Sequence, residues 1–320
     1  MIIAHKRFAA AGIVVELSPT NTLYTALPLA YQKDEIPAVS YSSWITGMET
    51  KPLTWFFVST PGWAPELATL MKLVKDNWTE KRPPRIGVIA YDHPATRDMI
   101  ERAPQFAPEL GVEFIGYEVV PVFGLIDSTT EWLRLAGKKP DWIYLGSYGG
   151  NLVVLIKDSA RLEIKKKGIG ICGSINSIDE AILDIVKDDA EGYFVLRATP
   201  LCTETKLSGM KAVLEAAKEY RNWEPNKVPG MYIGGWINAQ VAIEGIRLAI
   251  EKVGFENLTG RTVRDALASM NNFDTGLIPP ITMGNNWPFW ASHWRVYLIQ
   301  RRRAVPISDW LEPAYVLPLE

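Results

Sequence analysis

The chain has 320 residues, with 34 basic and 36 acidic side chains, a formal net charge of −2 and 48% hydrophobic residues. This near-neutral balance excludes the positive field that gathers nucleic acid or an anionic membrane, and the length predicts two domains. No apolar run reaches the roughly 20 residues of a membrane-spanning helix, so no segment is expected to cross a bilayer.

Short β-rich runs alternate with helical patterns along the chain, which is typical of βαβ units and a parallel sheet. Most of these runs are continuously apolar, as expected for strands that helices cover on both faces. The sequence therefore predicts an α/β fold. The predicted strands are Gly12–Leu17, Ile36–Ser40, Arg85–Tyr91, Val112–Val120, Asp141–Leu145, Gly168–Cys172 and Gly192–Leu196.

The helices between these strands have identifiable starts. Pro65 stands at a first helical position, and apolar residues then recur at three- and four-residue spacing to about Trp78. Ser128–Glu131 matches a capping box, and Ser177–Glu180 opens the next helical run in the same way.

The longest helix is predicted from about Tyr232 to Val253. Gly254 supplies the stop signal at its C-terminal end. Large apolar residues recur along it at helical spacing. The predicted buried face consists of Trp236, Ala239, Ile243, Ile246 and Ile250.

Segments rich in Pro and Gly interrupt the strand and helix pattern at residues 59–63, 199–203 and 274–280. Three interruptions predict three crossings between two lobes, with the hinge near Pro61, Pro200 and Gly276. The predicted first lobe is therefore 1–60 plus 201–276. The predicted second lobe is 61–200 plus 277–320.

The residues that usually carry enzyme chemistry form no known pattern. His5, His93 and His293 have no Asp or Ser at motif spacing, and the sequence lacks the nucleophile-elbow and nucleotide-binding motifs. Cys172 and Cys202 form no CxxC pair, so either two buried thiols or one disulfide is compatible with them. We expect no enzyme, no metal site and no cofactor.

Hydroxyl and amide side chains follow the predicted strands. Ligands of open α/β sheets bind beyond the carboxyl ends of the strands, and hydroxyls and helix N-termini bind a carboxylate without a full counter-charge. Helix capping is the alternative role for the residues after the first strand, and packing between lobes is the alternative for Trp44 and Tyr148. His93 is otherwise a plain loop histidine. The predicted ligand-binding residues are Ser18, Thr20, Asn21, Ser42, Ser43, Trp44, His93, Thr96, Ser147, Tyr148 and Asn176.

Six motifs follow one another in a specific order: Ser18–Thr22, Ile36–Ser43, Trp55–Pro61, Arg85–Asp92, Ala190–Gly192 and Phe273–Thr282. Together they resemble the type I periplasmic binding proteins, specifically the leucine-isoleucine-valine-binding group of ABC transporters, over nearly the whole chain. The resemblance implies two Rossmann-like lobes joined by three crossover strands.

The resemblance also implies a function. A small carboxylate, amide or amino-acid-like solute would bind between the lobes by hinge closure, and the protein would be a monomer that docks on a membrane permease. Its location would be periplasmic or extracellular. A ligand-sensing receptor or regulator of the same fold is the alternative. Family members often hold the ligand's amino group with an acid near the position of Ile175 or Asn176, and its absence here argues against an α-amino acid.

Family members begin with a strand, a helix and a second strand that do not precede Met1 here. By this analogy about 60 to 80 residues are expected to be missing from the first lobe. Residues Met1–Phe8 also lack the order of charged and apolar residues of a signal peptide.

Overall fold

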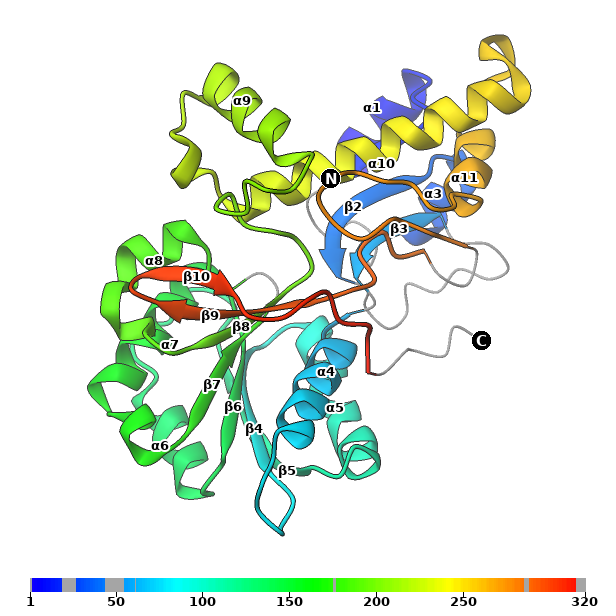
Figure 1. The fold of residues 1–320 in the computed structure, drawn as a ribbon. Coiled ribbons are helices and arrows are strands. Elements are labelled where there is room, and N and C mark those ends of the chain that lie inside the picture. The colour runs from blue at the N-terminus through cyan, green and yellow to red at the C-terminus, as the bar shows by residue number, and fades with distance from the viewer. Residues whose placement is uncertain are drawn as a thin grey trace.

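Two sheets organise the chain in the computed structural model, one in each of the two lobes seen in Figure 1. The structure describes residues 2–18, 27–43, 55–60, 62–174, 177–284 and 288–314, with Pro28, Ser42 and Ser43 described as backbone only. The predicted α/β fold with mostly parallel strands is confirmed.

A three-stranded parallel sheet in the order β1-β2-β3 organises the first lobe. Its elements are α1 (Ile2–Ala10), β1 (Glu16–Ser18), α3 (Pro28–Asp34), β2 (Ala38–Ser43) and β3 (Phe56–Thr60). The first strand begins later than the predicted Gly12. Gly12 has a φ of +70° in the turn that ends α1, so its backbone is not extended there.

A seven-stranded sheet organises the second lobe. Its strands are β4 (Arg85–Tyr91), β5 (Glu113–Val120), β6 (Trp142–Gly146), β7 (Gly170–Gly173), β8 (Phe194–Arg197), β9 (Arg295–Gln300) and β10 (Arg303–Pro306). They lie in the order β10-β9-β8-β7-β6-β4-β5, and β4 has the predicted bounds. The antiparallel hairpin β9–β10 was not predicted. Its turn places Arg301 and Arg302 at positive φ, and arginine carries none of the usual turn signal.

Helices cover the faces of this second sheet. They are α4 (Trp63–Asp76), α5 (Pro94–Glu109), α6 (Thr129–Gly137), α7 (Gly149–Arg161) and α8 (Glu180–Val186). In α4 the predicted apolar spacing is confirmed, because Leu67, Leu70, Met71 and Val74 are all buried. Burying each such side chain stabilises the fold by about 1.5–3 kcal/mol.

At two predicted helix starts, the capping hydrogen bonds differ from the expected ones. Ser128 is the N-cap of α6, but its side chain makes no cap bond and its hydroxyl donates to Asp158 instead. At the start of α8 the N-cap is Asp179 rather than Ser177, and its carboxylate accepts from two backbone N–H groups. A helix still begins at or just after each predicted position, because neighbouring residues supply the hydrogen bonds at its start.

The chain returns to the first lobe through three further helices, α9 (Met210–Arg221), α10 (Gly230–Val253) and α11 (Gly260–Ala268). Short 3-10 turns join the elements at Ile164–Lys167, Lys187–Ala190, Pro225–Lys227 and Phe255–Asn257. α10 lies against β2, where Asn238 donates from Nδ2 to the carbonyl oxygen of Val39 at 3.1 Å.

The predicted buried face of α10 is wrong. Ile243 is 64% exposed, whereas Gly234 and Gly245 are buried. A Cβ atom at Gly234 would overlap the ring of Tyr41, and one at Gly245 would lie 2.6 Å from Leu267. Ile233, Ile237 and Val241 lie on this buried face together with the glycines, so α10 has apolar residues on two faces and close approach to Tyr41 and Leu267 distinguishes the buried one.

The last passage between the lobes lies C-terminal to the predicted Gly276. The backbone N–H groups of Trp290 and Ala291 donate to the carbonyl oxygens of Val58 and Ser59 in β3, at 3.0 and 2.7 Å. The chain then joins the seven-stranded sheet at Arg295. These contacts hold residues 288–291 beside the first sheet.

Cys172 and Cys202 are both free and buried, so the alternative of a disulfide is wrong. Cys172 lies in β7, and Cys202 follows β8. Both behave as small apolar side chains inside the second lobe and its junction with the first.

Candidate functional site

The predicted ligand-binding residues of the second lobe follow the carboxyl ends of parallel strands. His93 follows β4, and Ser147 and Tyr148 follow β6, while Ser174, which is not among the predicted residues, follows β7. Because β4, β6 and β7 are neighbours in the sheet, these loops lie at one edge. This edge is where open α/β sheets bind ligands.

Aromatic rings pack together at this edge. The ring centroid of Tyr91 lies 5.4 Å from that of His93, 5.1 Å from that of Tyr148 and 5.6 Å from that of Trp63. Tyr91 and Trp63 are buried, whereas Tyr148 is 41% exposed. Tyr148 therefore presents an apolar ring whose orientation the buried rings support.

His93 is the N-cap of α5, and its Nδ1 accepts a hydrogen bond from the backbone N–H of Ala95 at 3.2 Å. Because Nδ1 accepts, the neutral ring carries its proton on Nε2 and offers a donor there. Burial lowers the pKa of His93 below its ordinary value, and the neighbouring Asp92 only partly opposes this shift. The ring is thus neutral at pH 7.

Thr96 is used inside the protein. It is fully buried, and its hydroxyl donates to the carbonyl oxygen of His93 at 2.9 Å and also contacts the carbonyl oxygen of Tyr91. Its Oγ1 also accepts from the backbone N–H of His93, which completes a capping box at the start of α5. The structure places Thr96 beneath the loop rather than on its surface.

The start of α7 combines a buried hydroxyl with open space. Ser147 is 1% exposed, and its Oγ has no hydrogen-bond partner within the described part of the chain. Tyr148, the N-cap of α7, makes no side-chain cap bond. Gly149 and Gly150 follow it, and a Cβ atom at either would meet nothing within 4 Å. No side chain covers Gly149 and Gly150, and the first N–H groups of this 13-residue helix have no partner within the helix, which suits an anionic group.

The first lobe contributes strand ends of the same kind. Ser18 ends β1, is buried, and accepts a hydrogen bond from the hydroxyl of Ser40 at its carbonyl oxygen. Ser43 ends β2 beside Thr60 of β3. Ser42 also lies in β2, and the side chains of Ser42 and Ser43 are not described. Thr20, Asn21, Trp44 and Asn176 lie outside the described residues.

Two aromatic residues that sequence reasoning missed lie where the lobes meet. The hydroxyl of Tyr41 lies 3.4 Å from Oγ1 of Thr199, which follows β8. Trp290 stacks on Tyr41 with ring centroids 6.0 Å apart and donates from Nε1 to the carbonyl oxygen of Ser40. Two tryptophans in the segment Asn286–Trp290 were the available sequence signal for this junction.

The described residues contain no cluster of His, Cys, Asp and Glu side chains that could hold a metal ion. Among the helices in the described ranges, none combines the length and apolar character needed to cross a bilayer.

The comparisons with known proteins agree with this architecture. Residues 4–298 match the model of a family described as periplasmic binding protein. A branched-chain amino acid ABC transporter protein from Thermus thermophilus with bound valine is similar, with a TM-score of 0.84 and 21% identity over 99% of this chain and 82% of that chain. No curated protein sequence matches the chain.

Two other solved structures are similar in fold. The fatty acid ABC transporter substrate-binding protein from Thermomonospora curvata has a TM-score of 0.78 and 17% identity, over 99% of this chain and 78% of that chain. A solute-binding protein from Rhodopseudomonas palustris BisB5 in complex with 3,4-dihydroxybenzoic acid has a TM-score of 0.76 and 16% identity, over 99% and 85%.

Proposed function

Because the chain belongs to the periplasmic binding protein family, we propose that it is the solute-binding component of an ABC importer and holds a small molecule between its lobes. One observation carries this proposal. At the edge of the second sheet, the unpartnered hydroxyl of Ser147 and the exposed ring of Tyr148 lie beside the start of α7, where Gly149 and Gly150 carry no side chain. A few polar groups beside an apolar ring suit a small solute.

The polar groups of this edge favour a carboxylate or amide. The N–H groups at the start of α7, the Ser147 hydroxyl and Nε2–H of His93 are all donors, and none of them carries a full positive charge. Three similar structures are a protein with bound valine, a fatty acid ABC transporter substrate-binding protein and a complex with 3,4-dihydroxybenzoic acid, and all three of these small molecules carry a carboxyl group. We therefore place the carboxylate or amide of the solute at the start of α7.

The apolar part of the solute would lie on Tyr148. This ring is held at its edge by Tyr91, so it contributes contact area without a large loss of side-chain entropy. A solute with a carboxylate next to an apolar or aromatic group would place the carboxylate at the start of α7 and the apolar group on the ring of Tyr148.

The mechanism that we propose is hinge closure. A solute bound to the second lobe would gain contacts with the strand ends of the first lobe only when the lobes close, and this difference favours the closed form. The closed protein, as a monomer outside the cytoplasm, would then dock on a membrane permease. The role requires binding and release, and no chemical step.

Ligand-induced thermal stabilisation tests the proposal. Valine, octanoate and 3,4-dihydroxybenzoate are each compared with the corresponding methyl ester, and short amides are screened beside them. A bound solute at 100 times its Kd stabilises the native state by about 2.7 kcal/mol, so at least one acid or amide should raise Tm while its ester does not. If no acid or amide changes the Tm of the folded chain, the proposal is wrong.

A further inference from the structure

A buried arginine lies at the junction of the two lobes. Arg197 is the last residue of β8 and is 1% exposed. It donates from Nη1 to the carbonyl oxygen of Ile178 at 3.2 Å and from Nε to that of Thr199 at 3.4 Å. Among the described residues, no carboxylate lies within ion-pair distance of it. A buried charge is costly, and here the two carbonyl oxygens and the more distant carboxylate of Glu180 offset that cost.

The remaining nitrogen of the guanidinium, Nη2, contacts the first lobe. Gly230 is the first residue of α10, and a Cβ atom there would overlap Nη2 of Arg197. The guanidinium therefore touches a loop of the second lobe, the passage between the lobes and a helix of the first lobe.

The two residues that accept hydrogen bonds from Arg197, Ile178 and Thr199, lie close in the chain to residues of the candidate site or in contact with residues of the first lobe. Ile178 lies in the loop that follows β7, four residues after Ser174, whose hydroxyl contacts the carbonyl oxygen of Ser147 at 3.4 Å. Thr199 contacts Tyr41 of β2 through its own hydroxyl, and Tyr41 packs on Gly234 of α10. Arg197 thus connects the loop after β7 to the residues that join the two lobes.

We propose that Arg197 is a positioning residue that couples the loop after β7 to the angle between the lobes. This inference rests on the proposed solute-binding function but concerns a residue outside the site. The rigid fork of a guanidinium spans two carbonyl oxygens at once, which the single ammonium of a lysine does not do in the same geometry. The hydrogen bonds to Ile178 and Thr199 fix the position of the loop after β7 relative to the segment that joins the lobes.

Distances between the lobes test this coupling in the absence of any solute. Spin labels are attached at Ile126→Cys in the second lobe and Phe255→Cys next to α10, which are 92% and 70% exposed, while the native cysteines are buried. We expect Arg197→Lys to broaden the distance distribution and to weaken solute affinity by about tenfold, within the range of typical conformational coupling. Arg264→Lys is the matched control, because Arg264 is also buried but lies in α11 against Trp55 and Asp265.

Gly230→Ala is a second, independent variant, because its Cβ atom displaces the guanidinium. We expect it to broaden the distribution as Arg197→Lys does, and to have little added effect in the Arg197→Lys background. If both single variants keep the wild-type distribution and lose only as much Tm as Arg264→Lys, Arg197 is merely structural and the proposal is wrong. A broadened distribution in a chain that binds no solute would support the coupling and contradict the proposed function, so the two failures are distinguishable.

Discussion

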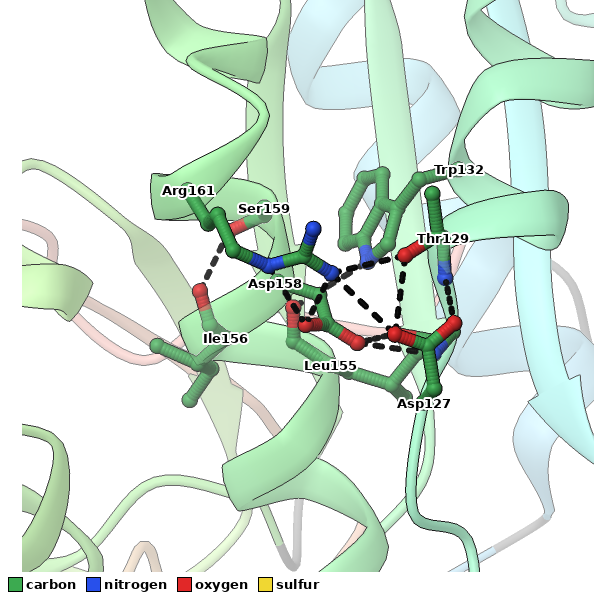
Figure 2. A network of polar contacts seen from close by, with 9 residues as sticks. Asp127, Thr129, Trp132, Leu155, Ile156, Asp158, Ser159 and Arg161 are labelled. Atoms are coloured by element: carbon green, nitrogen blue, oxygen red, sulfur yellow. Dashed lines mark hydrogen bonds and ion pairs between the residues drawn. The ribbon is translucent and has the colours of Figure 1, made fainter.

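Asp158 of α7 accepts two hydrogen bonds from Ser128, one from its backbone N–H at 2.7 Å and one from its hydroxyl at 2.8 Å. Arg161, one turn further along α7, donates to the same carboxylate and also to Asp127 and Thr129 (Figure 2). This network joins the start of α6 to α7 on the outer face of the second lobe. It explains why a serine that resembles a helix cap in the sequence is used for a contact between helices.

Asp158→Asn should destabilise the protein by about 1–3 kcal/mol, because the amide nitrogen replaces one carboxylate oxygen and each of these oxygens accepts from two donors. Urea unfolding at pH 7 measures this loss. Asp127→Asn is the control, since the ion pair between Asp127 and Arg161 is exposed and contributes less than about 1 kcal/mol. Equal losses in both variants would contradict the assignment.

The contribution of Asp158 should also depend on pH. Burial raises its pKa, but the hydrogen bonds from Arg161 and Ser128 outweigh this effect and hold the pKa below its ordinary value. Because the pKa of Asp158 is lower in the folded than in the unfolded state, its ionised carboxylate stabilises the fold above the unfolded pKa of about 3.9. This stabilisation is lost as the pH falls below that value. The difference in unfolding free energy between wild type and Asp158→Asn should therefore shrink as the pH falls from about 5 to below about 4.

Thr96→Val should lower stability by about 1–3 kcal/mol and leave solute affinity unchanged, because the buried hydroxyl bonds only to the backbone around His93. Thr262→Val removes the corresponding hydroxyl from the less buried capping box of α11 and should cost about 0.5–1 kcal/mol. Calorimetric unfolding and titration measure the two quantities. A selective loss of affinity with unchanged stability would make Thr96 a ligand contact, as the sequence suggests.

Tyr148→Ala should weaken solute binding by about tenfold, and Tyr148→Phe should retain affinity, because the proposed contact is the ring face. Neither change should alter Tm by more than about 2 °C, since Tyr148 makes no cap bond to α7. Tyr220→Ala on α9, which is also exposed, controls for surface effects. If the phenylalanine variant binds as weakly as the alanine variant, the hydroxyl rather than the ring makes the contact.

The two cysteines should be unreactive in the native protein. Burial raises the pKa of both thiols, that of Cys202 to about 12, so the thiolate is scarce at pH 8. An aromatic disulfide reagent should modify neither thiol without denaturant and both after unfolding. Rapid native modification of one thiol would show that the junction beside Cys202 opens.

Much of the fold follows from local sequence. The continuous apolar run Arg85–Tyr91 is a strand with those bounds, and the apolar face of α4 is buried as its spacing predicts. Gly254 ends α10 with a φ of +79°, which glycine adopts without strain. In these places backbone preference and side-chain period agree, so no distant contact is needed to decide the structure.

Tertiary contacts decided the remainder. α10 carries apolar residues on two faces, and the close approach of Tyr41 and Leu267 to its glycines decides which of the two is buried. Thr96 follows a strand end like the other predicted site residues, yet packing turned its hydroxyl inward, whereas Tyr148 stayed on the surface. The sequence by itself determined which loops form the candidate site, because strand ends and helix starts are local. Only the tertiary structure decided which side chains in those loops are accessible, because exposure depends on residues far away in the chain.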